Sequence, residues 1–334
     1  MRVLTYAQAI REAFQQLLAS DPRVFVIGQG LWSPWYVGAS MQDLDREFGR
    51  DRVIDTPVCE NASTGAAIGA ALAGMRPIVV HPRMDFMLLA ADPIINQAAN
   101  WSYMFGGQIG VPVVIRSIIN RGGEQGAQHS QALQAFFLHV PGIKVVMPAS
   151  PFDAKGLLIA AVRDGNPVMY IDDRWLYGSV GEVPSAMYEI PIGAGSVRRQ
   201  GFDVTIVSSS YLVGEALTAA ETLRTCGVEA EVIDLRSIKP WDRQLVFSSV
   251  RKTGRLIVAD GGWTTGGVAA EIAAAVACDA FGFLKAPIQR VALPDAPAPA
   301  AQALERAYYP TADQILAAAE RVLALDRMPA LQEA

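Results

Sequence analysis

The sequence predicts a two-domain α/β protein built on parallel β-sheets. Short β-branched runs alternate with longer stretches at helical spacing, which is typical of parallel α/β architecture. A length of 334 residues suits two domains of ordinary size. A stretch rich in Gly, Pro and short apolar pieces, residues 177–199, separates two such alternating sets. We therefore place one domain at 1–185, a linker at 186–202 and a second domain at 203–334.

The first domain is expected to begin with an amphipathic helix that Thr5 caps. Its apolar side chains recur at helical spacing, at Ala7, Ile10, Phe14, Leu17 and Leu18. A small-residue helix at 66–73 and two longer helices at 87–104 and 151–163 follow, with Pro93 interrupting the first of these two early. Strands are predicted at 24–28, 77–80, 111–115, 144–147 and 168–171.

The second domain repeats this alternation. We predict its strands at 204–208, 229–233 and 255–258, and its helices at 214–226, 268–278 and 312–324.

Composition excludes several classes of protein. The 28 basic and 33 acidic residues give a formal charge of −5, which argues against a nucleic-acid partner. No apolar run reaches membrane-spanning length, and the charges inside the apolar pattern of residues 1–20 exclude a signal peptide. We therefore expect a cytoplasmic protein with no membrane partner. Charged residues make up only 18% of the chain, which hints at buried subunit contacts.

Common catalytic and binding motifs are absent. Cys59, Cys226 and Cys278 are too widely spaced for a disulfide framework or a CxxC zinc site. The three histidines lack metal-ligand spacing, and the chain contains neither GxSxG nor GxxxxGK[ST]. Gly28-Gln29-Gly30 follows a strand, but Ser33 stands where a dinucleotide fingerprint needs its third glycine.

Glu60 is the most informative carboxylate in the sequence. It lies where the strand-like VIDTPV run gives way to a Gly- and Ala-rich helix, DTPVCENASTGAAIGAALAG at 55–74. Side chains at such a junction point into the crevice where α/β proteins bind ligands. One interpretation is a simple cap on the helix dipole. The other is a ligand contact, because the small residues around it permit close approach of a backbone or a flat ring.

A glycine-rich loop, RGGEQGAQHSQ at 121–131, ends in His129. Three glycines followed by His-Ser-Gln are unsuited to a packed core, because buried loops leave backbone groups unpaired. The residues alone leave open whether this is a functional loop or a surface loop with an incidental histidine.

These segments together resemble the beta subunit of the thiamine-diphosphate-dependent 2-oxo acid dehydrogenases, the pyruvate, branched-chain and acetoin dehydrogenase family related to transketolase. The similarity covers nearly the whole chain. It runs through DRVIDTPVCENASTGAAIGAALAGMRPIV, MDFMLLAADPIINQAAN, QHSQALQAFFLHVPGIKVVMPASPFDAKGLLIAAVRDGNPV, VIDLRSIKPWD and GGWTTGGVAAEIAA. The resemblance implies a parallel-sheet pyrimidine-binding domain followed by a transketolase C-terminal-like α/β domain.

The resemblance also implies roles for four residues. Glu60 matches the glutamate that hydrogen-bonds N1′ of the thiamine aminopyrimidine and favours its 4′-imino form, which removes the C2 proton. Phe86 matches the aromatic residue that packs on the aminopyrimidine. His129 matches the histidine at the mouth of the active site that assists acyl transfer to a lipoyl group. His139 also matches a family histidine, to which we assign a structural role.

The family often binds a potassium ion through backbone carbonyls, and the matching positions follow. They are Val113, Ala161, Val162, Asp164 and Asn166.

The diphosphate and Mg²⁺ are held in the family by a GDG sequence with a downstream Asn, and this chain has no GDG. The resemblance therefore implies an alpha subunit that carries this motif in an α2β2 assembly. A lipoyl-bearing acyltransferase is the further partner that it implies.

Four segments depart from the family pattern near the expected pocket. Gln29-Gly30 replaces acidic residues, and Trp32 and Trp35 lie where a Tyr-Gly-Gly type segment is usual. Asn61-Ala62 and His81-Pro82-Arg83 are the other two. We therefore expect a specialised paralogue that oxidatively decarboxylates a 2-oxo acid. The alternatives are a split transketolase-like carboligase and a catalytically silent assembly subunit.

Overall fold

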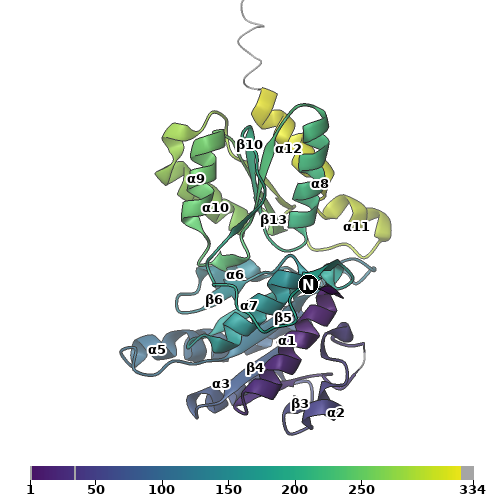
Figure 1. The fold of residues 1–334 in the computed structure, drawn as a ribbon, viewed down its shortest axis with the longest axis vertical. Coiled ribbons are helices and arrows are strands. Elements are labelled where there is room, and N and C mark those ends of the chain that lie inside the picture. The colour runs from purple at the N-terminus through teal and green to yellow at the C-terminus, as the bar shows by residue number, and fades with distance from the viewer. Residues whose placement is uncertain (1, 34, 325–334) are drawn as a thin grey trace, which may run out of the picture. The chain divides into compact units, whose positions relative to one another are not determined.

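The computed structural model describes residues 2–33 and 35–324, and these form two compact units (Figure 1). Unit 1 comprises residues up to 121, 128–192 and 237–240. Unit 2 comprises 122–127, 193–236 and 241 onward. Each unit has its own parallel sheet, so the predicted α/β class is confirmed. Residues 1 and 325–334, at the ends of the two predicted domains, lie outside the described residues.

A seven-stranded sheet forms the centre of unit 1. Its strands run parallel to one another, except that β12 (Ser237–Lys239), at one edge, pairs antiparallel with its neighbour. The order across the sheet is β12 (Ser237–Lys239), β6 (Lys144–Val146), β7 (Val168–Asp173), β5 (Val114–Ile119), β4 (Arg76–His81), β2 (Val24–Gly28) and β3 (Val53–Asp55). The strand predicted at 111–115 begins three residues later than expected, at Val114.

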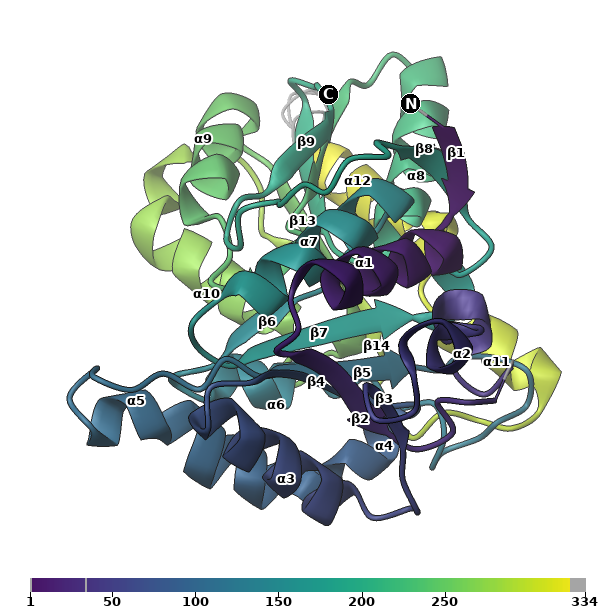
Figure 2. The ribbon, with the colours of Figure 1, turned by 60° about the horizontal axis from the view of Figure 1, so that its bottom comes forward.

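Helices cover both faces of this sheet, with α1 and α7 on one face and α3 on the other (Figure 2). A buried apolar cluster lies beneath α1 and α7, to which Tyr6, Ile10, Phe14, Leu157 and Leu158 contribute. The helices of unit 1 are α1 (Tyr6–Ser20), α2 (Leu44–Phe48), α3 (Glu60–Leu72), α4 (Met84–Met87), α5 (Asn100–Met104), α6 (Gln134–His139) and α7 (Pro151–Arg163). Short 3₁₀ turns occur at η1 (Gly38–Met41), η2 (Leu88–Ala90) and η4 (Arg174–Leu176).

The predicted cap of α1 is confirmed. The Thr5 side chain accepts a hydrogen bond from the Gln8 backbone, and the Gln8 side chain accepts one from the Thr5 backbone. This reciprocal pair is a capping box. Just before it, β1 (Arg2–Thr5) pairs antiparallel with β8 (Val180–Val183).

The helix predicted at 87–104 is helical throughout, within residues 84–104, but it changes type along its length. It runs from α4 through η2 and the π-helical η3 (Pro93–Ala99) to α5. Pro93 cannot donate a backbone hydrogen bond, so the regular α-helical ladder is interrupted at that point.

Unit 2 holds a five-stranded sheet with helices on both sides (Figure 1). The order is β14 (Gln289–Leu293), β13 (Leu256–Trp263), β10 (Val204–Ser208), β11 (Ala230–Asp234) and β9 (Ser196–Arg199), with β9 antiparallel. Its helices are α8 (Leu212–Thr225), α9 (Arg243–Thr253), α10 (Val268–Asp279), α11 (Gln302–Tyr308) and α12 (Ala312–Ala324), with a 3₁₀ turn at η5 (Phe281–Phe283). No helix in the described part of the chain is long and apolar enough to cross a bilayer.

Candidate active site

Glu60 is the first residue of α3 and its side chain is buried, with 5% of the residue exposed. The chain reaches it from β3 through Thr56, whose N–H donates to the Gly28 carbonyl at 2.8 Å. A carboxylate in the first turn of a helix is favoured by the helix dipole. The helix start therefore explains why an acidic side chain is tolerated here. It does not by itself provide hydrogen-bond donors for the carboxylate oxygens.

One neighbouring side chain bonds to that carboxylate. Gln29 Nε2 donates to Glu60 Oε1 at 3.3 Å, and Gln29 is itself buried. The Gln29 amide oxygen has no hydrogen-bond partner in the described structure. The second Glu60 oxygen makes no hydrogen bond within the described residues and keeps some contact with solvent. It is therefore open to a ligand that brings a hydrogen-bond donor.

Gln29 is placed by the residue before it. A Cβ on Gly28 would lie 2.4 Å from the Val80 carbonyl oxygen, so β2 and β4 approach too closely there for any other residue. Glycine at this point therefore lets Gln29 follow β2 directly into the carboxyl-end crevice of the sheet.

His81, at the end of β4, contacts α3 one turn beyond Glu60. Its Nε2 lies 3.1 Å from Thr64 Oγ1. Burial lowers the pKa of His81 to about 4, so the imidazole is neutral at pH 7. The elements that adjoin Glu60 therefore contribute two neutral polar groups, Gln29 and His81.

Phe86 and His129 lie side by side in unit 1. Their rings meet edge to face with centroids 5.3 Å apart. Asp85 holds the two segments together, because its Oδ1 accepts from both the backbone and the side-chain nitrogen of Gln131 at 3.0 Å. Burial raises the pKa of Asp85, whose Oδ2 is buried without a partner among the described residues. Helix α4, which carries Phe86, also packs against α3.

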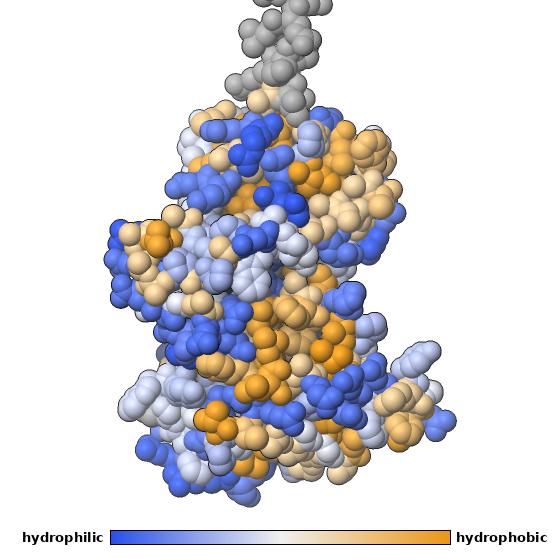
Figure 3. Space-filling view, turned by 180° about the vertical axis from the view of Figure 1, so that it is seen from behind, coloured by the Kyte–Doolittle hydropathy of each residue, from blue (hydrophilic) through white to orange (hydrophobic). Residues whose placement is uncertain are grey.

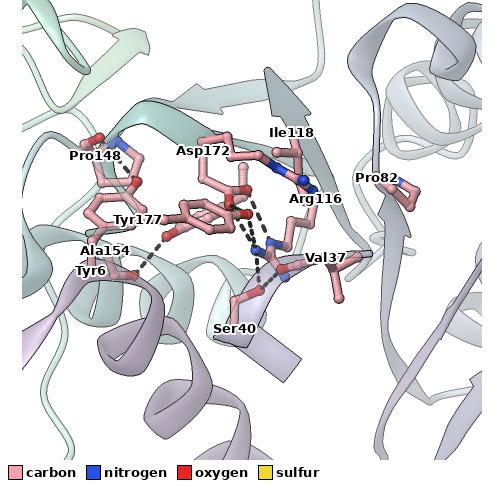
Figure 4. Close-up of polar contacts among 12 residues, drawn as sticks. Tyr6, Val37, Ser40, Pro82, Arg116, Ile118, Pro148, Ala154, Asp172 and Tyr177 are labelled. Carbon is pink, nitrogen blue, oxygen red and sulfur yellow. Dashed lines mark hydrogen bonds and ion pairs between the residues drawn. The ribbon is translucent and has the colours of Figure 1, made fainter. Parts of the chain in front are cut away.

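A buried ionic network joins the middle of β5 to the carboxyl end of β7 (Figure 4). Arg116 donates to both carboxylate oxygens of Asp172, at 3.1 and 2.8 Å, and to Ser40 and Tyr177. Just past the end of β5, Asn120 Nδ2 donates to the Pro82 carbonyl at 3.1 Å. This hydrogen bond holds the backbone just before α4 begins. Sequence reasoning missed the network, whose only signal was a charged residue within each of two otherwise apolar strands.

The five predicted potassium positions do lie at one place, the end of α7 and the start of β5. Their carbonyls are largely occupied by N–H groups of the chain, however. Arg76 Nη1 donates to the carbonyls of Val162 and Asp164 at 2.6 and 3.2 Å. The carbonyls of Val113 and Ala161 accept from the backbone of Val168 and Asp164.

The Arg76 guanidinium places a positive charge beside these oxygens, while each carbonyl keeps a second lone pair. The carbonyl of Asn166 is the fifth predicted ligand. The potassium ion therefore stays a prediction. His139 ends α6 and is exposed, away from the contacts described for Glu60 and His129.

Helix α3 presents an exposed face of small residues. Ala62, Gly65, Ala66 and Gly69 are the residues of this face, and a Cβ on either glycine would meet nothing within 4 Å. Large apolar side chains are exposed elsewhere in unit 1, including Trp35, Leu89 and Tyr103. Figure 3 shows orange, hydrophobic side chains gathered on the face of unit 1 that it displays. Surfaces of this kind mark contacts with other chains.

Comparison with known proteins supports the same two-part organisation. The transketolase pyrimidine-binding domain matches residues 2–179, and the transketolase C-terminal domain matches residues 193–315. The beta subunit of acetoin:2,6-dichlorophenolindophenol oxidoreductase from Cupriavidus necator is 44% identical, over 96% of this chain and 98% of that protein. The pyruvate dehydrogenase E1 beta subunit from Rickettsia felis is 42% identical, over 96% of this chain and 98% of that protein.

The chain belongs to the transketolase-like family of 2-oxo acid dehydrogenase beta subunits.

A mitochondrial pyruvate dehydrogenase E1 beta-1 subunit from Oryza sativa is another relative of this beta subunit, at 43% identity over 95% of this chain and 86% of that protein. Among solved structures, a split gene transketolase described as an inactive beta4 tetramer matches with a TM-score of 0.77. It is 25% identical, over 96% of this chain and 97% of that one. The match supports the transketolase-like fold of the beta subunit.

Proposed function

We propose that this beta subunit supplies the pyrimidine-binding half of a thiamine-diphosphate site in an enzyme that oxidatively decarboxylates a 2-oxo acid. The observation that carries the proposal is the buried Glu60 carboxylate, whose only side-chain partner among the described residues is one amide donor. Thiamine diphosphate, when bound, supplies the electron sink for decarboxylation. The membership of the family supports this cofactor.

Three residues of this chain have different roles in the proposal. Glu60 holds a proton at N1′ of the aminopyrimidine through its free oxygen, and the half-buried Phe86 ring packs against that heterocycle. His129, in contact with Phe86, orients the lipoyl acceptor and assists acyl transfer. Burial of Glu60 strengthens its interaction with the ring nitrogen, because electrostatic interactions are stronger away from water.

Glu60→Gln tests the proposal. We expect the complex to lose most of its turnover, at least about a hundredfold, because an amide cannot serve as the anionic partner of N1′. The measurement is steady-state reduction of an artificial electron acceptor by the alpha–beta complex with a 2-oxo acid. Glu221→Gln, an exposed residue on α8, is the matched control. Unchanged turnover in Glu60→Gln would leave only an assembly role for this chain.

An alpha subunit completes the site in this proposal. It holds the diphosphate and Mg²⁺, for which this chain has no GDG motif, in an α2β2 assembly. The exposed small-residue face of α3 begins beside Glu60, so a chain packed on it lies beside the cofactor. A lipoyl-bearing acyltransferase receives the acyl group, and the cytoplasm is the compartment we propose.

Acetoin is a second candidate substrate, because one relative is named an acetoin:2,6-dichlorophenolindophenol oxidoreductase. Dye reduction with pyruvate and with acetoin distinguishes the two. Product formation that requires an aldehyde acceptor and no dye would instead favour the split transketolase-like carboligase. The quantity measured is the ratio of the kcat/KM value for pyruvate to that for acetoin.

A further inference from the structure

Gln29 is the one side chain that hydrogen-bonds the Glu60 carboxylate in the described structure. Its Nε2 lies 3.3 Å from Glu60 Oε1, and 8% of Gln29 and 5% of Glu60 are exposed. The two residues come from different elements, Gln29 from the end of β2 and Glu60 from the start of α3. Their contact therefore links the sheet edge to the helix that carries the carboxylate.

An amide at this position has a different effect from a carboxylate. The amide nitrogen only donates, so it holds Oε1 as an acceptor without competing for a proton. Two carboxylates at this distance would share one proton or repel each other. With Oε1 held, the other oxygen of Glu60 is left to face a donor.

We propose that Gln29 is a positioning residue that orients Glu60 toward the cofactor and, being an amide, adds no second carboxylate beside it. This inference rests on the proposed role of Glu60. Because Gln29 is an amide, the contact holds one carboxylate, and replacing Gln29 by a carboxylic acid is expected to change the pH dependence.

Several titratable groups on elements packed against β2 and α3 make hydrogen bonds of their own, and so do Arg76 of β4 and Glu12 of α1. Asp55, at the end of β3, accepts from the backbone of Gly30 at 2.6 Å. His81 of β4 is neutral at pH 7 and contacts Thr64. Asp85 of α4 accepts from Gln131, and Asp92, between η2 and η3, accepts from Asn96 at 2.7 Å. The turns η2 and η3 carry no charged side chain.

The Gln29 amide oxygen supports the same assignment. It is buried and has no partner in the described structure. The orientation of the amide is therefore not set by any contact to this oxygen. It is set by the hydrogen bond that Nε2 donates to Glu60. The opposite orientation would place two oxygens against each other.

The test uses the alpha–beta complex with two variants at this position. Gln29→Met keeps the approximate size and removes the donor, whereas Gln29→Glu places a second carboxylate beside Glu60. Gln244→Met, on an exposed position of α9, is the control. Three quantities are measured: the dissociation constant for thiamine diphosphate, the exchange rate of its C2 proton when bound, and the melting temperature of the cofactor-free complex across the mildly acidic to neutral pH range.

For Gln29→Met we expect C2 proton exchange to slow about tenfold while the dissociation constant changes less than about threefold. One charge-assisted hydrogen bond has an effect of this size on a positioned group. Exchange as fast as in the wild type, with the cofactor bound, would overturn the inference.

For Gln29→Glu we expect the melting temperature relative to wild type to fall as pH rises. The carboxylate pair binds a shared proton in the folded state, so this stability is present at low pH and is lost on deprotonation. In this variant the exchange rate of the C2 proton should rise toward the wild-type rate at the acidic end of the pH range. There the introduced carboxyl group is protonated and donates a hydrogen bond as the amide does. A melting temperature with the wild-type pH dependence would overturn the inference, whereas failure of the wild-type complex to bind thiamine diphosphate would overturn the proposed function instead.

Discussion

Glu60 illustrates how burial turns a common residue into a candidate catalytic group. An exposed glutamate at a helix start gains only a small dipole stabilisation. Here the same residue is buried, and a single amide satisfies one of its two oxygens. The neutral groups around it, Gln29 and the Thr64–His81 pair, provide hydrogen bonding without adding charge.

His81 is the residue whose titration the structure predicts most directly. Burial lowers its pKa from 6.5 to about 4, so the unfolded chain binds a proton that the folded chain does not between these values. Stability therefore rises with pH across this window and is lost as pH falls through it, by up to roughly 3 kcal/mol. We expect His81→Gln, which can still bond Thr64, to lose less stability than wild type as pH falls through that window. Urea unfolding at several pH values measures this, and equal losses in both proteins would contradict it.

At the scale of elements, the end of α7 is the clearest example of tertiary support. Arg76, from the start of β4, donates to the carbonyls of Val162 and Asp164, which the helix end leaves unsatisfied. A guanidinium also complements the negative end of the helix dipole. The same carbonyls were predicted from the resemblance to bind potassium.

Since Arg76 already donates to two of these carbonyls, we expect them to need no potassium ion for stability. We expect equal melting temperatures in KCl and NaCl at the same ionic strength. Arg76→Met should lose about 1–3 kcal/mol, because two charge-assisted hydrogen bonds disappear, and should become more stable in KCl than in NaCl. Arg23→Met, whose ion pair with Asp21 is largely exposed, is the control. A rise specific to potassium in the wild type would show instead that the ion binds alongside Arg76.

At the scale of the whole molecule, unit 1 exposes several large apolar side chains and a face of small residues. The exposed face of α3 and the exposed Trp35, Leu89 and Tyr103 all belong to unit 1. Together with the low charged fraction of 18%, this surface supports assembly with another chain. The similar solved structure is itself a tetramer of beta chains described as inactive.

Ala66→Trp tests this assembly. Ala66 is exposed on α3, so a large side chain there should be tolerated within the chain and should block a closely packed partner. We expect the folding stability of the beta chain to change by less than about 0.5 kcal/mol, while co-purification of the co-expressed alpha subunit falls at least about tenfold. Ala277→Trp, on an exposed position of α10, is the control. Normal recovery of the alpha subunit with Ala66→Trp would place the interface elsewhere.

The sequence by itself determined the two-domain α/β class, most buried strands and the identities of Glu60, Phe86 and His129 as candidates. Fully buried strands such as β10 and capped helices such as α1 and α7 carry local composition and capping signals, which depend only on neighbours in the chain. The motifs around Glu60 likewise lie in one continuous segment.

Only the tertiary structure decided which groups surround these residues. The antiparallel edge strands β8, β9 and β12 were missed because they are short and depend on distant partners. The contacts Gln29–Glu60, Asp85–Gln131 and Arg76–Val162 join residues 31, 46 and 86 positions apart. Such contacts leave no local pattern, because hydrogen bonds between distant segments form only once the sheet brings strand ends to a common edge.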